Sequence, residues 1–176
     1  MRWLALLRGV NVGGARSLPM AELEWMFRAA GARAVETVIQ SGNVIFDADD
    51  AEETGAAAAR AIEAKFGFRP AMIMRSARRW RTMVDANPFV AAGHSEDHLH
   101  VACLAVAPDP EAPAPLDPKA IVPEEFAIAG ADVYLRLPNG VARANLTNAR
   151  LDKAFRTVST LRNWRTVLKL LERVEA

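Results

Sequence analysis

The alternation of strand-like and helix-like segments in residues 1–75 is the feature that most restricts the fold of this chain. Short apolar runs rich in β-branched residues indicate strands, whereas apolar residues spaced three and four apart indicate helices. The resulting order is strand, helix, two strands, helix, strand. With right-handed crossovers, it predicts a ferredoxin-like split βαβ unit, in which both helices cover one face of a four-stranded antiparallel sheet. The segments are residues 2–9, 18–31, 34–48 (a hairpin), 50–67 and 70–75.

The rest of the chain repeats much of this order. A connecting helix and loop in residues 76–98 lead to a strand, a semi-rigid proline-rich loop over residues 107–118, two strands that turn at Gly130, and a helix. A last helix begins at Asn163 and carries apolar side chains on one face. We therefore predict an α+β chain of two ferredoxin-like halves with mostly antiparallel sheets and a C-terminal amphipathic helix. The expected parts are 1–75 (first half), 76–98 (connection) and 99–176 (second half with the last helix).

The composition is that of an ordinary globular protein. The only cysteine, Cys103, lies in an apolar run, so the sequence offers neither a disulfide framework nor the Cys/His spacing of a zinc site. The first residues do not have the pattern of a signal peptide, and no apolar run approaches the roughly 20 residues that a membrane span needs. We therefore expect a cytoplasmic protein of bacterial type that binds no membrane and no cofactor.

Charge is distributed unevenly along the chain, although the net charge is only +1. Residues 1–20 carry +3 and residues 136–176 carry +6, whereas residues 89–135 carry −7. If the two basic ends meet in the fold, they create a local positive field that attracts an anionic ligand.

The segment "RGVNVGG" directly after the first strand is the strongest candidate for a binding site. Backbone N–H groups exposed at Gly13 and Gly14, together with Arg8 and Asn11, would cradle a phosphate or a carboxylate. The segment is neither a P-loop, since no Gly-Lys-Ser/Thr follows, nor a GxGxxG fingerprint. The structural alternative is that the glycines permit turns with positive φ and that Asn11 caps its own backbone.

Two further segments suit the same ligand. Ser41 and Asn43 lie in the predicted hairpin turn and would add hydrogen bonds, although an ordinary turn also explains them. Arg162 and Asn163 open the last helix, where Asn163 is a good N-cap and Arg162 would grip an anion. We expect residues 9–16 to lie beside this helix start in one positively biased pocket. No acid or base is placed there to move a proton, so no catalytic residue is assigned and enzymatic activity stays open.

A metal site is a weaker possibility in the segment "HSEDHLH", which begins with His94. His98 and His100 share one face if the strand has already begun, and Glu96 or Asp97 would add an oxygen ligand. A complete ligand set is not specified, so ordinary histidines explain the pattern better and no metal is predicted. Whether these histidines ever bind a metal stays open.

Two other classes of function remain as alternatives. Arg75, Arg78 and Arg79 fall on one arc of a predicted helix, so residues 75–81 and the sheet would form a nucleic-acid-binding module. The isoelectric point near 8.0 is lower than such a module usually has. The remaining alternative is a structural or partner-binding protein without a ligand site. The oligomeric state is left open.

Five segments are similar to a bacterial family called domain of unknown function 1697, in the same order from Leu4 to Leu171. The family has a Ser-Lys pair where this chain has Ala144 and Asn145, so a hydroxyl and a lysine that would contact an anion are missing. The resemblance implies no function beyond the one predicted from the residues, which is binding of a small phosphate- or carboxylate-bearing ligand or a nucleotide. The segments are "LALLRGVNVGG", "PMAEL", "VIQSGNVIF", "RLPNGVARANLT" and "TLRNWRTVLKLL".

Overall fold

The computed structural model describes residues 1–14, 16–109 and 116–176. Half of the proline-rich segment expected to be semi-rigid, residues 110–115, therefore lies outside the described residues. The chain divides into two compact units, which are considered separately below. The first comprises Met1–Arg81 with Leu170–Ala176, and the second comprises Thr82–Lys169.

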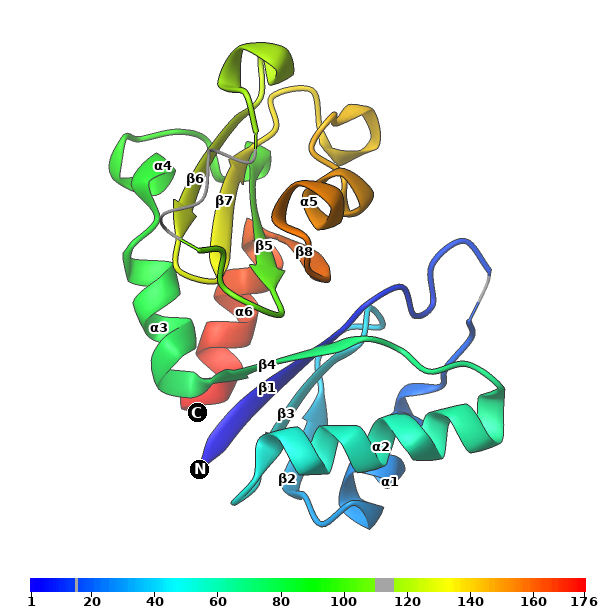
Figure 1. Ribbon diagram of the computed structural model, residues 1–176. Helices are drawn as coiled ribbons and strands as arrows, with labels where there is room; N and C mark the ends of the chain where they lie inside the picture. Colours follow the sequence, from blue (N-terminus) through cyan, green and yellow to red (C-terminus); the bar gives the residue numbers. More distant parts are fainter. Residues whose placement is uncertain (15, 110–115) are drawn as a thin grey trace. The chain divides into compact units, whose positions relative to one another are not determined.

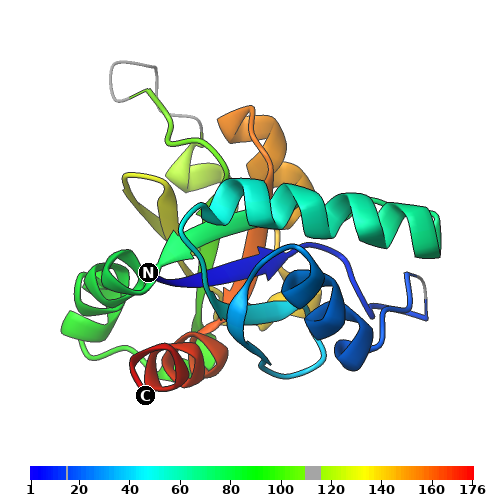
Figure 2. The same ribbon diagram turned by 90° about the horizontal axis from the view of Figure 1, so that it is seen from below.

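The first unit has the predicted strand and helix order. Its strands form a four-stranded sheet in the order β2-β3-β1-β4, and every neighbouring pair is antiparallel. Both helices lie on one face of this sheet (Figures 1 and 2). The predicted ferredoxin-like topology is thus confirmed. The elements are β1 (Arg2–Leu7), α1 (Met20–Ala29), β2 (Arg33–Thr37), β3 (Asn43–Asp47), α2 (Ala51–Phe66) and β4 (Met72–Ser76).

The core of the first unit lies between this sheet and its two helices. Ala5 and Leu7 of β1 contribute to the same buried cluster as Phe46 of β3 and Phe27 of α1, whose rings are 5.0 Å apart. Asp50 caps the start of helix α2, because its side chain accepts from the N–H of Glu53 at 3.0 Å. The alternation along β1 places Leu4 and Leu6 on the opposite face, and they are fully buried too.

The second unit has the same sheet order. Its strands run β6-β7-β5-β8, again with all neighbours antiparallel. A 3₁₀ turn stands between its first two strands, where the first unit has a helix. The elements are α3 (Ala77–Asp85), which begins in the first unit, α4 (Pro88–Ala91), η1 (Glu96–His98), β5 (Leu99–Leu104), η2 (Pro118–Ile121), β6 (Glu125–Ala129), β7 (Asp132–Arg136), η3 (Val141–Arg143), α5 (Asn148–Phe155), β8 (Ser159–Asn163) and α6 (Trp164–Glu175), which ends in the first unit.

Strand β8 was not expected from the sequence. The sequence assigned residues 163–176 to the last helix and gave no structure to the residues before it, whereas Ser159–Asn163 pair with β5 along its whole length. This fourth strand completes the second half, which therefore has the same sheet topology as the first.

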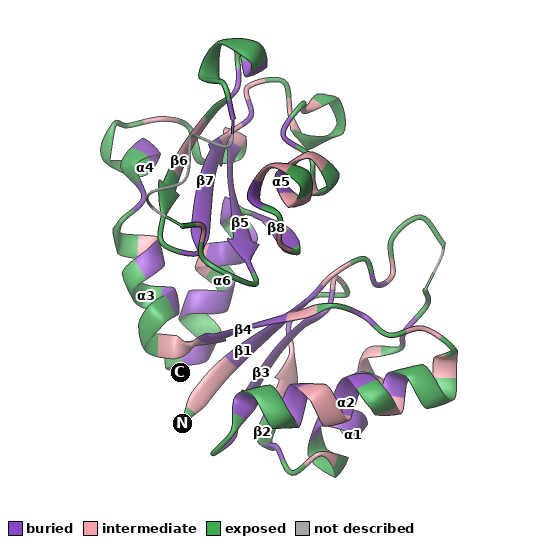
Figure 3. Cartoon of the chain, in the orientation of Figure 1, coloured by how far each residue is buried: buried purple, intermediate pink, exposed green. Residues whose placement is uncertain are grey.

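The faces of the second sheet are covered differently. Ala102 and Leu104 of β5 pack with Leu151 and Phe155 of α5 in one buried cluster. Tyr134 points to the other face, where its hydroxyl donates to the Met83 carbonyl oxygen at 2.7 Å. Both faces of the sheet are therefore covered at β5, which is buried along its whole length (Figure 3).

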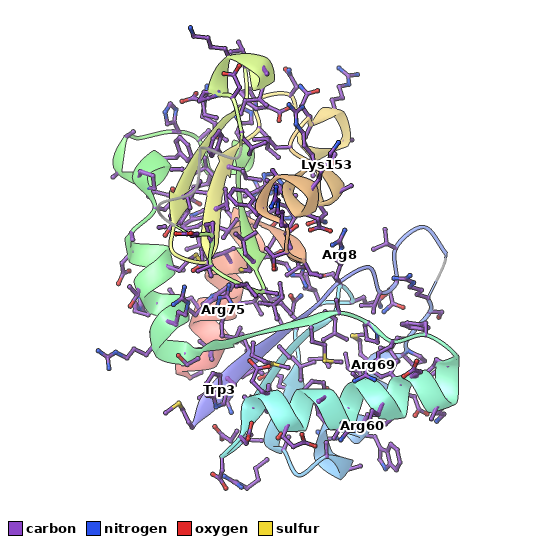
Figure 4. The ribbon with its side chains drawn as sticks, viewed as in Figure 1. Trp3, Arg8, Arg60, Arg69, Arg75 and Lys153 are labelled. Carbon is purple, nitrogen blue, oxygen red and sulfur yellow. The ribbon has the colours of Figure 1, made fainter. Side chains whose placement is uncertain are left out.

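One arrangement occurs in both units, at the fourth residue of the last strand. Arg75 in β4 is opposite Leu4, the third residue of β1, and Arg162 in β8 is opposite Val101, the third residue of β5. Both arginines are buried, and the Nη1 of each donates to the carbonyl oxygen of the residue before it. Figure 4 shows Arg75 projecting from β4. The prediction that Arg75 shares a helix face with Arg78 and Arg79 is wrong, because the helix begins only at Ala77.

The residue after each of these arginines caps the helix that follows. The Ser76 hydroxyl accepts from the N–H of Arg79 at 3.3 Å, and the Asn163 amide oxygen accepts from the N–H of Thr166 at 2.8 Å. The predicted N-cap role of Asn163 is thus confirmed. A buried arginine followed by a capping residue and a helix is a local structural repeat, although the two sequences, "MRSARRW" and "LRNWRTV", share little beyond the arginine.

No helix in the described part of the chain is long and apolar enough to cross a membrane. The cytoplasmic location stays a prediction.

The β2–β3 turn is held by a close approach of backbone and side chains at Gly42. Gly42 has φ +74°, and a Cβ at this position would lie 2.8 Å from Leu7 Cβ and closer still to Val10. Gly13 has φ +61° but open space around an added Cβ. Glycine is therefore required at residue 42 for space as well as for conformation.

We predict that Gly42→Ala lowers the free energy of unfolding by about 2–5 kcal/mol, from left-handed strain and overpacking together. Gly13→Ala, which adds the strain alone, should cost about 1–2 kcal/mol. Urea unfolding of both variants measures the difference, and equal losses would contradict the packing argument.

Candidate functional site

The candidate loop joins β1 to α1 and is described except for residue 15. It leaves the sheet at Arg8, whose N–H donates to the Ala71 carbonyl oxygen at 2.9 Å. Val10 and Leu18 are buried and fix its two ends, while the glycines between them are exposed (Figure 3). The loop turns by repeated left-handed conformations, with positive φ at Gly9, Asn11, Gly13, Gly14 and Arg16.

Asn11 is the residue that closes this loop. Its Nδ2 donates to the Leu18 carbonyl oxygen at 2.9 Å and to the Gln40 carbonyl oxygen at 3.0 Å. Its Oδ1 accepts from the N–H of Leu18 at 2.7 Å. Both amide hydrogens are thereby used, so the side chain keeps only acceptor capacity. Asn11 therefore has the structural role considered from the sequence. Its side-chain amide, however, binds the backbone of Leu18 and Gln40 and not the backbone of Asn11 itself.

We predict that Asn11→Ala lowers the free energy of unfolding by about 2–4 kcal/mol, because three hydrogen bonds are lost at about 1 kcal/mol each. Gln40→Ala is the matched control, since it keeps the carbonyl group that Asn11 contacts. Chemical denaturation should separate the two variants. Wild-type stability of the Asn11 variant would mean that the side chain is not structural.

A cavity of about 590 Å³ lies where this loop meets the start of α1. Pro19 stands at the N-cap position and gives α1 no side-chain cap. The N–H groups of a first helical turn have no acceptor within their own helix, and they give that end a partial positive charge. Glu22 in this turn pairs with Lys65 at 2.6 Å, so its charge is compensated. The cavity is lined by Asn11, Gly14, Ser17, Leu18, Pro19, Met20, Ala21 and Gln40.

Only part of the predicted set lines this cavity. Asn11 and Gly14 do, whereas Arg8 and Gly13 are not among its lining residues. Arg8 projects from the end of β1 (Figure 4). Ser17 and Gln40 line the cavity and were not predicted. One feature of the sequence could have located this cavity wall. A proline, Pro19, stands where a capping residue would precede the helix.

Ser41 and Asn43 belong to the hairpin. The Asn43 Nδ2 donates to the Val38 carbonyl oxygen and to the Ser41 hydroxyl, both at 3.0 Å. Asn43 is completely buried, so these contacts hold the turn. Their predicted contact with a ligand stays a prediction.

Arg162 differs from the exposed flanking charge that the sequence suggested. It lies within β8 and is 8% exposed, and its Nη1 donates to the Thr160 hydroxyl at 2.8 Å. Burial lowers the pKa of Arg162 to about 10, an effect that Cys103 opposes, so the guanidinium stays positive at neutral pH. Residues 9–16 and Arg162 belong to different units, and their predicted convergence on one ligand stays a prediction.

The histidine segment adopts a different structure from the one considered. His98 ends a 3₁₀ turn and the strand begins at Leu99, so His98 and His100 do not share a strand face. The residues that the structure describes contain no group of three or more His, Cys, Asp or Glu side chains that could hold a metal ion.

His100, considered from the sequence only as a metal ligand, is a buried polar residue. It is 6% exposed and lies opposite Asn163 across the β5–β8 pair. Burial lowers the pKa of the His100 imidazole below its usual range, and the backbone carbonyl of His98 opposes this only in part. The folded state therefore disfavours the charged ring.

Because the folded pKa of His100 is depressed, the unfolded chain binds more protons as the pH falls through about 6.5. This contribution to stability is complete above that pH and is lost below it. We predict that unfolding free energy decreases from pH 7 to pH 5 and that His100→Gln reduces this slope. Urea unfolding at several pH values measures it, and an unchanged slope would contradict the assignment.

Two four-stranded antiparallel sheets built from βαβ units define an α+β protein of duplicated ferredoxin-like topology. The family model described as "Protein of unknown function (DUF1697)" matches residues 1–134, so the chain belongs to this family, as its sequence motifs indicated. The fold is similar to that of the conserved bacterial protein SP0830 from Streptococcus pneumoniae, with a TM-score of 0.71 and 17% identity over 99% of this chain and 98% of that one. The comparison with curated proteins gives no significant match.

Proposed function

We propose that this protein binds a small anionic ligand, bearing a phosphate or a carboxylate, at the loop between β1 and α1. A nucleotide belongs to this class. The observation that carries the proposal is the cavity at the start of α1, where a helix of ten residues begins without a side-chain cap. An oxygen atom of the ligand would accept the hydrogen bonds that a capping side chain otherwise accepts.

The residues around the cavity suit this role. Ser17 and Gln40 offer polar side chains, and Gly14 brings exposed backbone to its wall without a side chain in the way. Asn11 orients the wall through its contacts with Leu18 and Gln40. A volume of about 590 Å³ falls in the range of roughly 300–1,000 Å³ that small-molecule sites have. The proposal makes no claim of catalysis.

The other residues of the predicted site enter the proposal as further contacts. Arg8 adds positive charge, Gly13 adds a backbone N–H group, and Ser41 with Asn43 adds hydrogen bonds from the hairpin. The alternative of nucleic-acid binding is weakened, since Arg75 is buried and leaves a smaller basic face.

Ala21 offers a direct test because it is exposed and lines the cavity within the first turn of α1. We predict that Ala21→Asp abolishes anion binding, since its carboxylate occupies the helix start. The variant should nevertheless be more stable than wild type by about 0.3–1 kcal/mol. Loss of binding would then not reflect loss of fold.

Ala29→Asp, at the other end of the same helix, is the matched control with the same change of charge. It should bind as wild type does. Inorganic phosphate, acetate and adenosine monophosphate serve as probes, in thermal-shift and calorimetric titrations. A probe at a hundred times its Kd stabilises the wild type by about 2.7 kcal/mol. If no probe binds, or if Ala21→Asp binds as well as wild type, the proposal is wrong and the structural alternative is favoured.

A further inference from the structure

The segment that contains η3 and α5 carries an excess of positive charge in the second unit. Residues 141–156 hold four bases and one acid, which gives a net charge of +3. Figure 4 shows Lys153, one of these bases, projecting from α5. We call the four bases together the α5 basic surface. They are Arg143 of η3, Arg150 and Lys153 of α5, and Arg156, the residue that follows this helix; three are exposed and Arg150 is half-buried.

Three members of the α5 basic surface lie on the outward side of the helix. At 3.6 residues per turn, Arg150, Lys153 and Arg156 span an arc of about 120°. Leu151 and Phe155 belong to the buried cluster that packs on the sheet, so they mark the inward side of α5. Lys153, at the centre of the arc, is about 180° around the helix from the mid-point of these two apolar residues. The three bases are therefore presented away from the core.

The acids nearest in the chain or in the fold to this surface are engaged by other groups. Asp152 Oδ1 accepts from the N–H and from the hydroxyl of Ser159, both at 2.7 Å. Glu124 is 4% exposed, and its carboxylate accepts from the N–H of Leu146 at 2.8 Å. Within the residues that the structure describes, no acidic side chain forms an ion pair with any of the four bases. Their charge is therefore left for a partner outside the chain.

Neither ordinary pairing nor the helix dipole explains the whole surface. Arg60 and Lys65, exposed bases of α2, each pair with a glutamate, at 2.9 Å and 2.6 Å. In α5, Lys153 and Arg156 stand at the C-terminal end, where the helix dipole favours a cation. Arg150 stands in the first turn, which contains no acid and where the dipole disfavours a cation. Arg150 therefore calls for another explanation.

We propose that the α5 basic surface binds the phosphate backbone of double-stranded DNA. Phosphate groups are the anions that arginine side chains grip with two parallel hydrogen bonds, and three of the four bases are arginines. The major groove of B-form DNA, roughly 12 Å wide, admits an exposed helix, whereas that of duplex RNA is deep and narrow. Contacts of this kind are independent of the base sequence.

The composition of the surface argues against two other polyanionic partners. Sites for single-stranded nucleic acid use exposed aromatic side chains on which the bases stack, and Phe155, the only aromatic residue in residues 141–156, is buried. A membrane-binding helix has large apolar residues beside its bases, and the arc from Arg150 to Arg156 has none. The surface does not include residues 75–81, and it is independent of the anion cavity proposed in the first unit.

The test titrates the full-length protein into a fluorescently labelled DNA duplex of about 20 base pairs and measures anisotropy at several salt concentrations. We expect a Kd on the order of micromolar at about 50 mM salt, and a slope of log K against log salt of about −3.6 for four phosphate contacts. Single-stranded DNA of the same sequence and the corresponding RNA duplex should each bind at least fivefold more weakly. If the DNA duplex does not bind, or if either of the other probes binds as tightly, the proposal is wrong.

A pair of double variants locates the binding surface. Arg150→Gln with Lys153→Gln removes two charges from α5 and should weaken duplex binding at least tenfold at low salt. Its salt slope should be shallower by about 1.8, because two phosphate contacts are lost. Arg60→Gln with Lys65→Gln makes the same change of net charge on α2 and should bind as wild type does. Equal effects of the two double variants would show that only net charge matters, which would overturn the assignment.

Arg156→Gly separates binding from folding. Arg156 has φ +51°, a conformation that glycine adopts without strain. The variant should therefore keep or raise the melting temperature of the protein, while duplex binding weakens at least threefold because one phosphate contact is lost. Loss of binding with an unchanged or higher melting temperature cannot come from structural damage. Wild-type binding by this variant and by the α5 double variant would exclude the surface.

Discussion

Each unit depends on a first strand that is held between two antiparallel neighbours and buried on both faces. In β1, residues 4–7 are at most 1% exposed, with β3 on one side and β4 on the other. Burial of both faces requires an unbroken apolar run, because a polar side chain there would need a buried partner. The run "LALL" meets this requirement and ends at Arg8, so polar chemistry begins where the strand leaves the sheet. The candidate loop is thus positioned by a deeply buried central strand of its unit.

The same constraint explains why the two units resemble each other without sharing sequence. In both, the last strand pairs with the first, carries a buried arginine at its fourth position, and passes through a capping residue into a helix. The arginines are held through the backbone of the preceding residue, which any sequence supplies. Only the arginine and the cap need to be retained for the arrangement to persist. The units differ where the first unit has α1, since η2 takes that place in the second. The first unit therefore has a cavity at the start of α1, and the second unit has one at the start of α6.

The sequence predicted the fold better than the site, for a physical reason. Hydrophobic spacing records which faces are buried, so the six elements of the first unit and the sheet class could be predicted. Strand β8 escaped because "STLRN" is short and polar at four of its five residues, and because it ends on a capping residue that is directly followed by a strong helical pattern. The sequence placed Arg75 on a helix face and Arg162 at a helix flank, and only the pairing of their strands with β1 and β5 shows that both are buried. The sequence considered His100 only as a metal ligand, and its burial could not be predicted because burial depends on which residues surround the ring in three dimensions.

The glycines of the first loop are explained by conformation, and it is the helix start that needs a further partner. Gly13 and Gly14 have positive φ with open space around an added Cβ, so turning the chain accounts for both. Among the helices of eight or more residues in the described ranges, α2, α3, α5 and α6 each have a side-chain cap, from Asp50, Ser76, Thr147 and Asn163. Helix α1 alone in that set begins at a proline, which contributes no side-chain oxygen. A missing cap costs about 1 kcal/mol, and a bound anion recovers it while gaining the attraction of the helix dipole. The uncapped start of α1, more than the glycines of the loop, is therefore the physical basis of the proposed anion site.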